Sequence, residues 1–130
     1  MNDLEFLNAF DSGNFPPSMF DHEAHLRLAW ISLKQYGEQE AIEKVCEGIK
    51  NFDVLHGDGS KFHTTLTVAS IKTVNHFMQK SKAHHFADFI QEFPRLKTSF
   101  KELLGQHYGF ELLSDPKAKE KYVAPDLLPF

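Results

Sequence analysis

Residues 21–37 have the sequence DHEAHLRLAWISLKQYG, the pattern of one complete amphipathic helix. Asp21 is a residue type favoured at the N-cap, where its carboxylate accepts a backbone N–H, and Gly37 is a natural C-terminal stop. Leu26, Ala29 and Leu33 recur at spacings of three and four residues, as residues on one helical face do. We therefore predict a helix over residues 22–36 with one apolar side.

The segments on either side of this stretch carry similar signals. We expect a third helix from about Glu38 to Leu55 and a fourth from Ser60, acting as its cap, to about Lys80. Shorter helices are expected over 4–10, 83–93, 96–104 and after Asp115-Pro116, followed by an extended tail over 124–130. No segment alternates apolar and polar residues with period two, as a half-buried strand would. The sequence therefore predicts an all-α fold, a single-domain bundle of five to seven helices spanning residues 1–130.

The composition favours a folded domain and excludes some partners. With 42% hydrophobic residues and 13 phenylalanines in 130 residues, the chain can bury a core without disulfides. Its one cysteine, Cys46, is expected in that core. The net charge is −4 and the basic residues are scattered, so we expect no nucleic-acid partner. No apolar run approaches the ~18 residues that cross a bilayer and no signal peptide is visible, so we expect a cytoplasmic protein without a membrane partner.

Three of the eight histidines fall on apolar helix faces. At ~100° per residue, His22 and His25 continue the apolar stripe of their helix. His63 faces inward in the same way on the expected fourth helix, and Thr67 and Ser70 follow it on that face. If consecutive helices pack antiparallel, the second and fourth helices run parallel, and their N-termini lie at the same end of the bundle. The sequence therefore predicts that the three imidazoles meet there.

Such a cluster is compatible with three kinds of role. Three imidazole nitrogens with an open position suit a divalent transition metal such as Zn, Fe, Cu or Ni. The first hypothesis is therefore an enzyme in which His22, His25 and His63 hold a metal that activates water or polarises a small polar substrate. The alternative is a metal-free module, in which neutral imidazoles and the hydroxyls of Thr67 and Ser70 bind a small anionic or carbonyl ligand. The third possibility is a structural role, with each ring hydrogen-bonded to backbone or to another ring.

The same residues carry a resemblance to a known family. The segments Phe20–Leu26, Lys61–Thr67 and Tyr122–Pro129 resemble, in this order, the (W/F)xHxxHL, YHxTLT and (W/Y)VxPDLxPLP motifs of a small bacterial family without an assigned activity. The resemblance maps the family's histidines onto His22, His25 and His63. Phe62 stands where the family's pattern usually has tyrosine, so the chain lacks that hydroxyl. The resemblance implies a site at these histidines and implies no particular reaction.

Overall fold

The computed structural model describes residues 1–130 and confirms the all-α fold: it has eight α-helices, five of them with seven or more residues, and no strand. Single 3-10 turns occur at Pro17–Met19 and Leu112–Ser114. No helix combines the length and the apolar character needed to cross a membrane. The helices are α1 (Asp3–Asp11), α2 (His22–Tyr36), α3 (Glu38–His56), α4 (Thr64–Met78), α5 (Phe86–Glu92), α6 (Arg95–Thr98), α7 (Phe100–Gly105) and α8 (Pro116–Glu120).

Helix α2 begins and ends where its caps predict. The Asp21 carboxylate accepts a hydrogen bond from the Ala24 backbone N–H at 2.9 Å. Gly37 follows the last turn with φ of 82°, a conformation that a side chain would strain. The apolar stripe predicted for this helix is buried, and Leu28 and Trp30 are among the least exposed side chains of the molecule.

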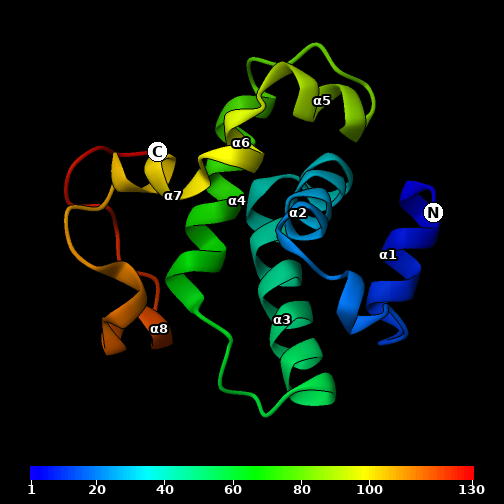
Figure 1. The fold of residues 1–130 in the computed structure, drawn as a ribbon, viewed down its shortest axis with the longest axis horizontal. Helices are drawn as coiled ribbons and strands as arrows, with labels where there is room; N and C mark the ends of the chain where they lie inside the picture. The colour runs from blue at the N-terminus through cyan, green and yellow to red at the C-terminus, as the bar shows by residue number, and fades with distance from the viewer.

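The directions of the central helices differ from the sequence-based expectation. Helix α2 packs against both α3 and α4, which also pack against each other. In Figure 1, α3 and α4 are seen from the side, whereas α2 is seen nearly end-on. Helix α2 therefore crosses the other two, and the prediction that α2 and α4 run parallel was wrong. Crossing lets α2 bury residues from much of its circumference, since α1, α5 and α6 also pack on it.

The start of α4 also differs from the prediction. Ser60 was expected to cap this helix, but the helix begins at Thr64 and its N-cap is His63. The carboxylate of Asp53, at the end of α3, accepts hydrogen bonds from the backbone N–H groups of Lys61 and Phe62 at 2.8 and 3.0 Å. These bonds hold the connecting segment outside helical geometry, so the helix starts later than its composition suggests.

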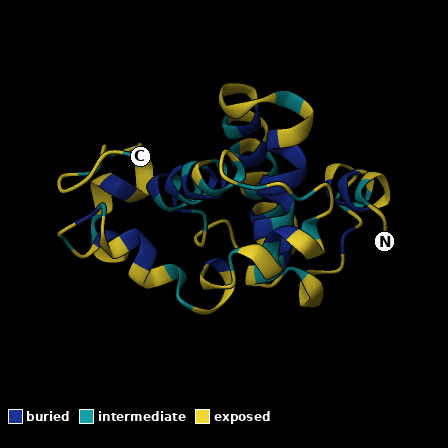
Figure 2. Ribbon diagram, turned by 90° about the horizontal axis from the view of Figure 1, so that it is seen from above, coloured by how far each residue is buried: buried dark blue, intermediate teal, exposed yellow.

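The C-terminal part of the chain packs beside α4, at the opposite end of the molecule from α1 (Figure 1). The single helix expected over 96–104 is divided at Ser99 into α6 and α7. This break lets Leu96 join the large core cluster around α2 while Leu104 joins a smaller one with Tyr108 and Ala118. Figure 2 shows the buried residues on the inner faces of the helices and the exposed ones on the periphery. The predicted extended tail packs on this part, with the Leu127 N–H bonded to the His107 carbonyl.

Candidate functional site

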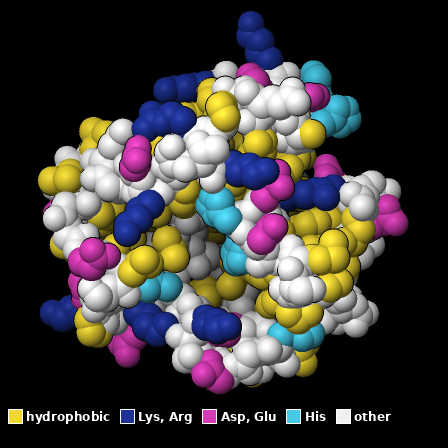
Figure 3. All heavy atoms as spheres, viewed as in Figure 1, with side chains coloured by type: hydrophobic (Ala, Val, Ile, Leu, Met, Phe, Trp, Pro, Cys, Tyr) yellow, Lys and Arg dark blue, Asp and Glu magenta, His cyan; other side chains and the backbone are white.

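The main feature of the structure is a cavity of about 970 Å³. Its wall is formed by the first half of α2, the second half of α3, the first three turns of α4, α6, α7 and the segment 108–113. It opens on the face drawn in Figure 3, where histidine, basic and hydrophobic side chains border a hollow. All five residues predicted as a site lie on its wall: His22, His25, His63, Thr67 and Ser70.

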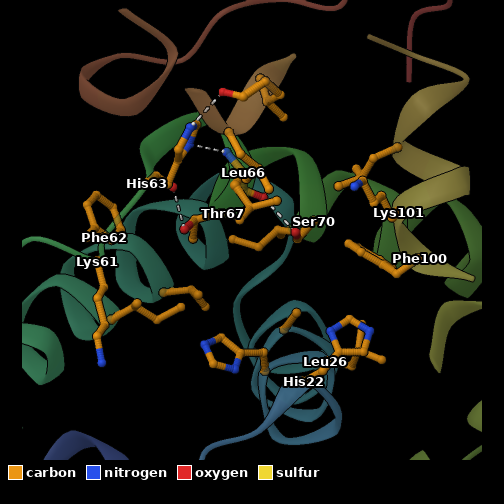
Figure 4. Close-up of a pocket in the computed structure, with 18 of the residues that line it drawn as sticks. His22, Leu26, Lys61, Phe62, His63, Leu66, Thr67, Ser70, Phe100 and Lys101 are labelled. Atoms are coloured by element: carbon orange, nitrogen blue, oxygen red, sulfur yellow. Dashed lines mark hydrogen bonds between the residues drawn. The ribbon is translucent and has the colours of Figure 1, made fainter. Parts of the chain in front are cut away.

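His63 is buried and both of its ring nitrogens are engaged. Its Nδ1 accepts a hydrogen bond from the Leu66 N–H at 3.0 Å, which makes the ring the N-cap of α4. A nitrogen that accepts carries no proton, so the proton is on Nε2, which donates to the Leu112 carbonyl at 3.1 Å. The ring therefore ties the start of α4 to the segment that precedes α8, as Figure 4 shows.

His22 is tied to a different part of the chain. Its Nε2 donates to the Leu96 carbonyl in α6 at 2.9 Å, because a carbonyl can only accept. The ring also packs against Phe100, with centroids 5.0 Å apart. In the neutral ring the other nitrogen, Nδ1, is then unprotonated. It is the nitrogen nearest the backbone, so the nitrogen at the outer end of the His22 ring is the one already engaged.

His25 uses the other ring nitrogen for its bond to the backbone. Its Nδ1 donates to the Asp21 carbonyl at 2.7 Å, and the ring stacks on Phe20 with centroids 3.8 Å apart. Solvent reaches the ring through the cavity, yet the surrounding protein replaces part of its hydration. This loss of hydration, together with the nearby His22, lowers the pKa of His25 from its ordinary value. The outer nitrogen, Nε2, makes no hydrogen bond with the protein and carries a lone pair in the neutral ring.

The three rings share the cavity without forming a ready metal centre. No group of three His, Cys, Asp or Glu side chains is placed to hold a metal ion. Each imidazole is bonded to a carbonyl from a different segment, at Asp21, Leu96 or Leu112. His63 would have to give up a hydrogen bond to bind a metal. These contacts are also those expected for structural histidines.

The hydroxyls of Thr67 and Ser70 face the same cavity, and each already donates its proton to a backbone carbonyl. Thr67 donates to the His63 carbonyl at 2.8 Å, and Ser70 donates to the Leu66 carbonyl at 2.6 Å. Bonds of this kind to the preceding helical turn are common for Ser and Thr. Both oxygens remain able to accept a hydrogen bond from a ligand, and neither has a proton left to donate.

The donors on the cavity wall are lysines that the sequence analysis did not select. Lys61, Lys97 and Lys101 line the cavity. Lys97 forms an ion pair with Glu23 at 3.4 Å, whereas the ammonium groups of Lys61 and Lys101 have no ion-pair or hydrogen-bond partner in the structure. Figure 4 shows these two on opposite sides of the cavity. Nothing in the sequence singles them out, because they are far apart along the chain and form no run.

The acidic groups of the wall are mostly engaged with backbone. Asp21 and Asp53 accept N–H bonds at the ends of α2 and α3, and Glu111 is exposed. The apolar share of the wall is large, since 16 of its 31 residues are hydrophobic. The cavity thus combines an apolar body with cationic groups that have no protein partner.

No known family model, curated protein or solved structure matches this chain. The resemblance to the bacterial family therefore gains no support from these comparisons.

Proposed function

We propose that this protein binds, without a metal ion, a small amphipathic molecule with an anionic group, of which a carboxylic acid is the simplest kind. The observation that carries the proposal is the cavity itself, with its apolar walls and its two unpaired lysines. Cavities that bind small molecules usually measure ~300–1,000 Å³ and combine apolar walls with a few polar groups. At about 970 Å³ this cavity has room for a ligand with an extended apolar part.

The charge on the wall supports an anion over a neutral carbonyl compound. The three imidazoles donate to backbone carbonyls, and the Thr67 and Ser70 hydroxyls donate within α4. The side-chain donors left for a ligand are therefore lysine ammonium groups, of which those of Lys61 and Lys101 have no ion-pair partner, whereas that of Lys97 is paired with Glu23. An ammonium group binds a carboxylate through a charge-assisted hydrogen bond, which is stronger than a bond to a neutral carbonyl.

Decanoate is a suitable first probe, because it has a carboxylate and a flexible apolar chain. Its binding is measured by displacement of anilinonaphthalene sulfonate fluorescence, with decanol as the uncharged comparison. We expect decanoate to bind more tightly than decanol, and the difference to shrink as salt screens the lysines. Lys61→Gln and Lys101→Gln should each weaken decanoate binding up to about fivefold, the size of a solvent-accessible ion pair.

Two further variants make this test specific. Lys50→Gln removes the same charge from an exposed position of α3 outside the cavity and should leave binding unchanged. Ser70→Phe adds a ring to the wall and should reduce binding of decanoate and decanol alike. Decanoate binding that survives Ser70→Phe, or that does not differ from decanol binding, would show that the cavity is not an acid-binding site.

The metal-dependent enzyme stays the second proposal, because the three predicted imidazoles line one cavity, together with that of His56. It requires His63 to leave the end of α4 and turn toward His22 and His25. A metal would supply a Lewis acid or an activated water there. Its test is metal content in protein purified without a histidine tag, compared with the His25→Ala variant. Stoichiometric metal that this substitution removes would support it.

A further inference from the structure

We infer that the ligand carries a hydroxyl or N–H group in addition to its acid, and that the Nε2 atom of His25 accepts the hydrogen bond from that group. This inference rests on the proposed function, since it assigns a second polar contact in the same cavity. It makes His25 a specificity-determining residue and narrows the ligand class to hydroxy or amino-substituted amphipathic acids.

The hydrogen bonds of the imidazoles decide which nitrogen is available. His63 has both nitrogens engaged, with Leu66 and Leu112. His22 uses Nε2, the nitrogen at the far end of the ring, for its bond to Leu96. His25 alone of the three uses Nδ1, the nitrogen near the backbone, and leaves Nε2 without a protein partner.

The His25 ring is held in an orientation that suits this contact. The bond to the Asp21 carbonyl is 2.7 Å long, and stacking on Phe20 fixes the plane of the ring. Because Nδ1 must donate to that carbonyl, Nε2 of the neutral ring can only accept. The lowered pKa of His25 favours this neutral form near neutral pH. A ligand group facing it must therefore bring a proton of its own.

Two hydroxyls on the cavity wall are also limited to accepting hydrogen bonds. The Thr67 and Ser70 oxygens can also accept only, because their protons are bonded within α4. The cavity thus offers acceptors from α2 and α4 and donors from Lys61 and Lys101. A molecule with an acid but no donor would bind the lysines and give the acceptors no partner within the ligand, whereas a hydroxy acid can bind both.

Two pairs of probes test this, each differing only in whether a donor is present. One pair is ω-hydroxydecanoate and ω-methoxydecanoate, and the other is para-hydroxycinnamate and para-methoxycinnamate. Calorimetric titration should show at least one hydroxy acid binding about three- to tenfold more tightly than its methoxy partner, the usual size of one hydrogen bond. His25→Phe keeps an aromatic ring on Phe20 and removes the acceptor, so it should abolish this preference.

Three controls separate the explanations. His25→Gln restores an acceptor oxygen and should recover part of the preference. His76→Phe makes the same change on an exposed histidine outside the cavity and should leave it intact. His22→Phe should keep the preference, because the outer nitrogen of His22 is already engaged.

The outcomes distinguish the inference from the function on which it rests. If both members of each pair bind equally to the wild type, or if His22→Phe and not His25→Phe removes the preference, the inference is overturned while an acid-binding cavity stands. If none of the four acids binds, the proposed function falls, and the inference falls with it.

Discussion

Replacing His63 by leucine should destabilise the protein, because this ring is the cap of α4. The side chain is 7% exposed and bonds both the Leu66 N–H and the Leu112 carbonyl. The Leu66 N–H, in the first turn of α4, then has no partner, and loss of a cap costs about 1–2 kcal/mol. The Leu112 carbonyl loses its bond from the His63 ring but keeps one long bond, from the Asp115 N–H at 3.3 Å. Loss of the bond from His63 therefore adds only about 0.5–1 kcal/mol.

The expected total is about 1.5–3 kcal/mol, or roughly 5–10 °C in melting temperature for a domain of this size. Urea unfolding followed by circular dichroism measures the free energy directly. His63→Asn should cost about 1 kcal/mol, because asparagine is a good N-cap but is too short to reach Leu112. Ser60→Ala, at the cap position expected from the sequence, should change stability by less than about 0.5 kcal/mol. A His63→Leu protein as stable as the wild type would refute this account of the ring.

Three further predictions concern other groups. The pKa of His25 is lowered in the folded protein, so protonation favours the unfolded chain. The free energy of unfolding should therefore be highest above about pH 6.5 and fall as the pH decreases from there. Thermal melts over a pH series measure this, and the same pH dependence in His25→Gln as in the wild type would contradict it. Burial raises the pKa of the Cys46 thiol to about 11, so its reaction with a disulfide reagent at pH 8 should be roughly a hundredfold slower than that of a free cysteine and should accelerate in urea. Asp53→Ala should cost about 2–3 kcal/mol by urea unfolding, because it leaves two backbone N–H groups before α4 without an acceptor; an equal loss in Asp53→Asn, which keeps an acceptor, would argue against that reason.

A last prediction addresses the metal hypothesis. Equimolar Zn²⁺ should not raise the melting temperature, because His63 has no nitrogen free to bind it. Differential scanning fluorimetry with and without a chelator measures this. A rise that disappears in His63→Asn would instead support the three-histidine metal site.

Local sequence signals determined much of the helical framework. The bounds of α2 followed from Asp21 and Gly37, and α8 followed from Asp115 and Pro116, because capping and turn preferences act over a few residues. The same signals placed His22 and His25 on one side of α2. They failed at α4, where the cap is a histidine and not Ser60, because the backbone before it is held by Asp53 in another helix.

The tertiary structure alone decided which distant carbonyls His22 and His63 contact. His22 bonds a carbonyl 74 residues away and His63 one 49 residues away, and no periodicity along the chain specifies such partners. The crossing of α2 over α3 and α4 brings the three rings to one cavity by a route other than parallel packing. It also brings Lys61 and Lys101 to opposite sides of that cavity. For His22 and His63, the nitrogen that faces the cavity depends on these long-range contacts, because each ring is oriented by the distant carbonyl to which it donates. His25 is instead oriented by the Asp21 carbonyl, four residues before it in the chain.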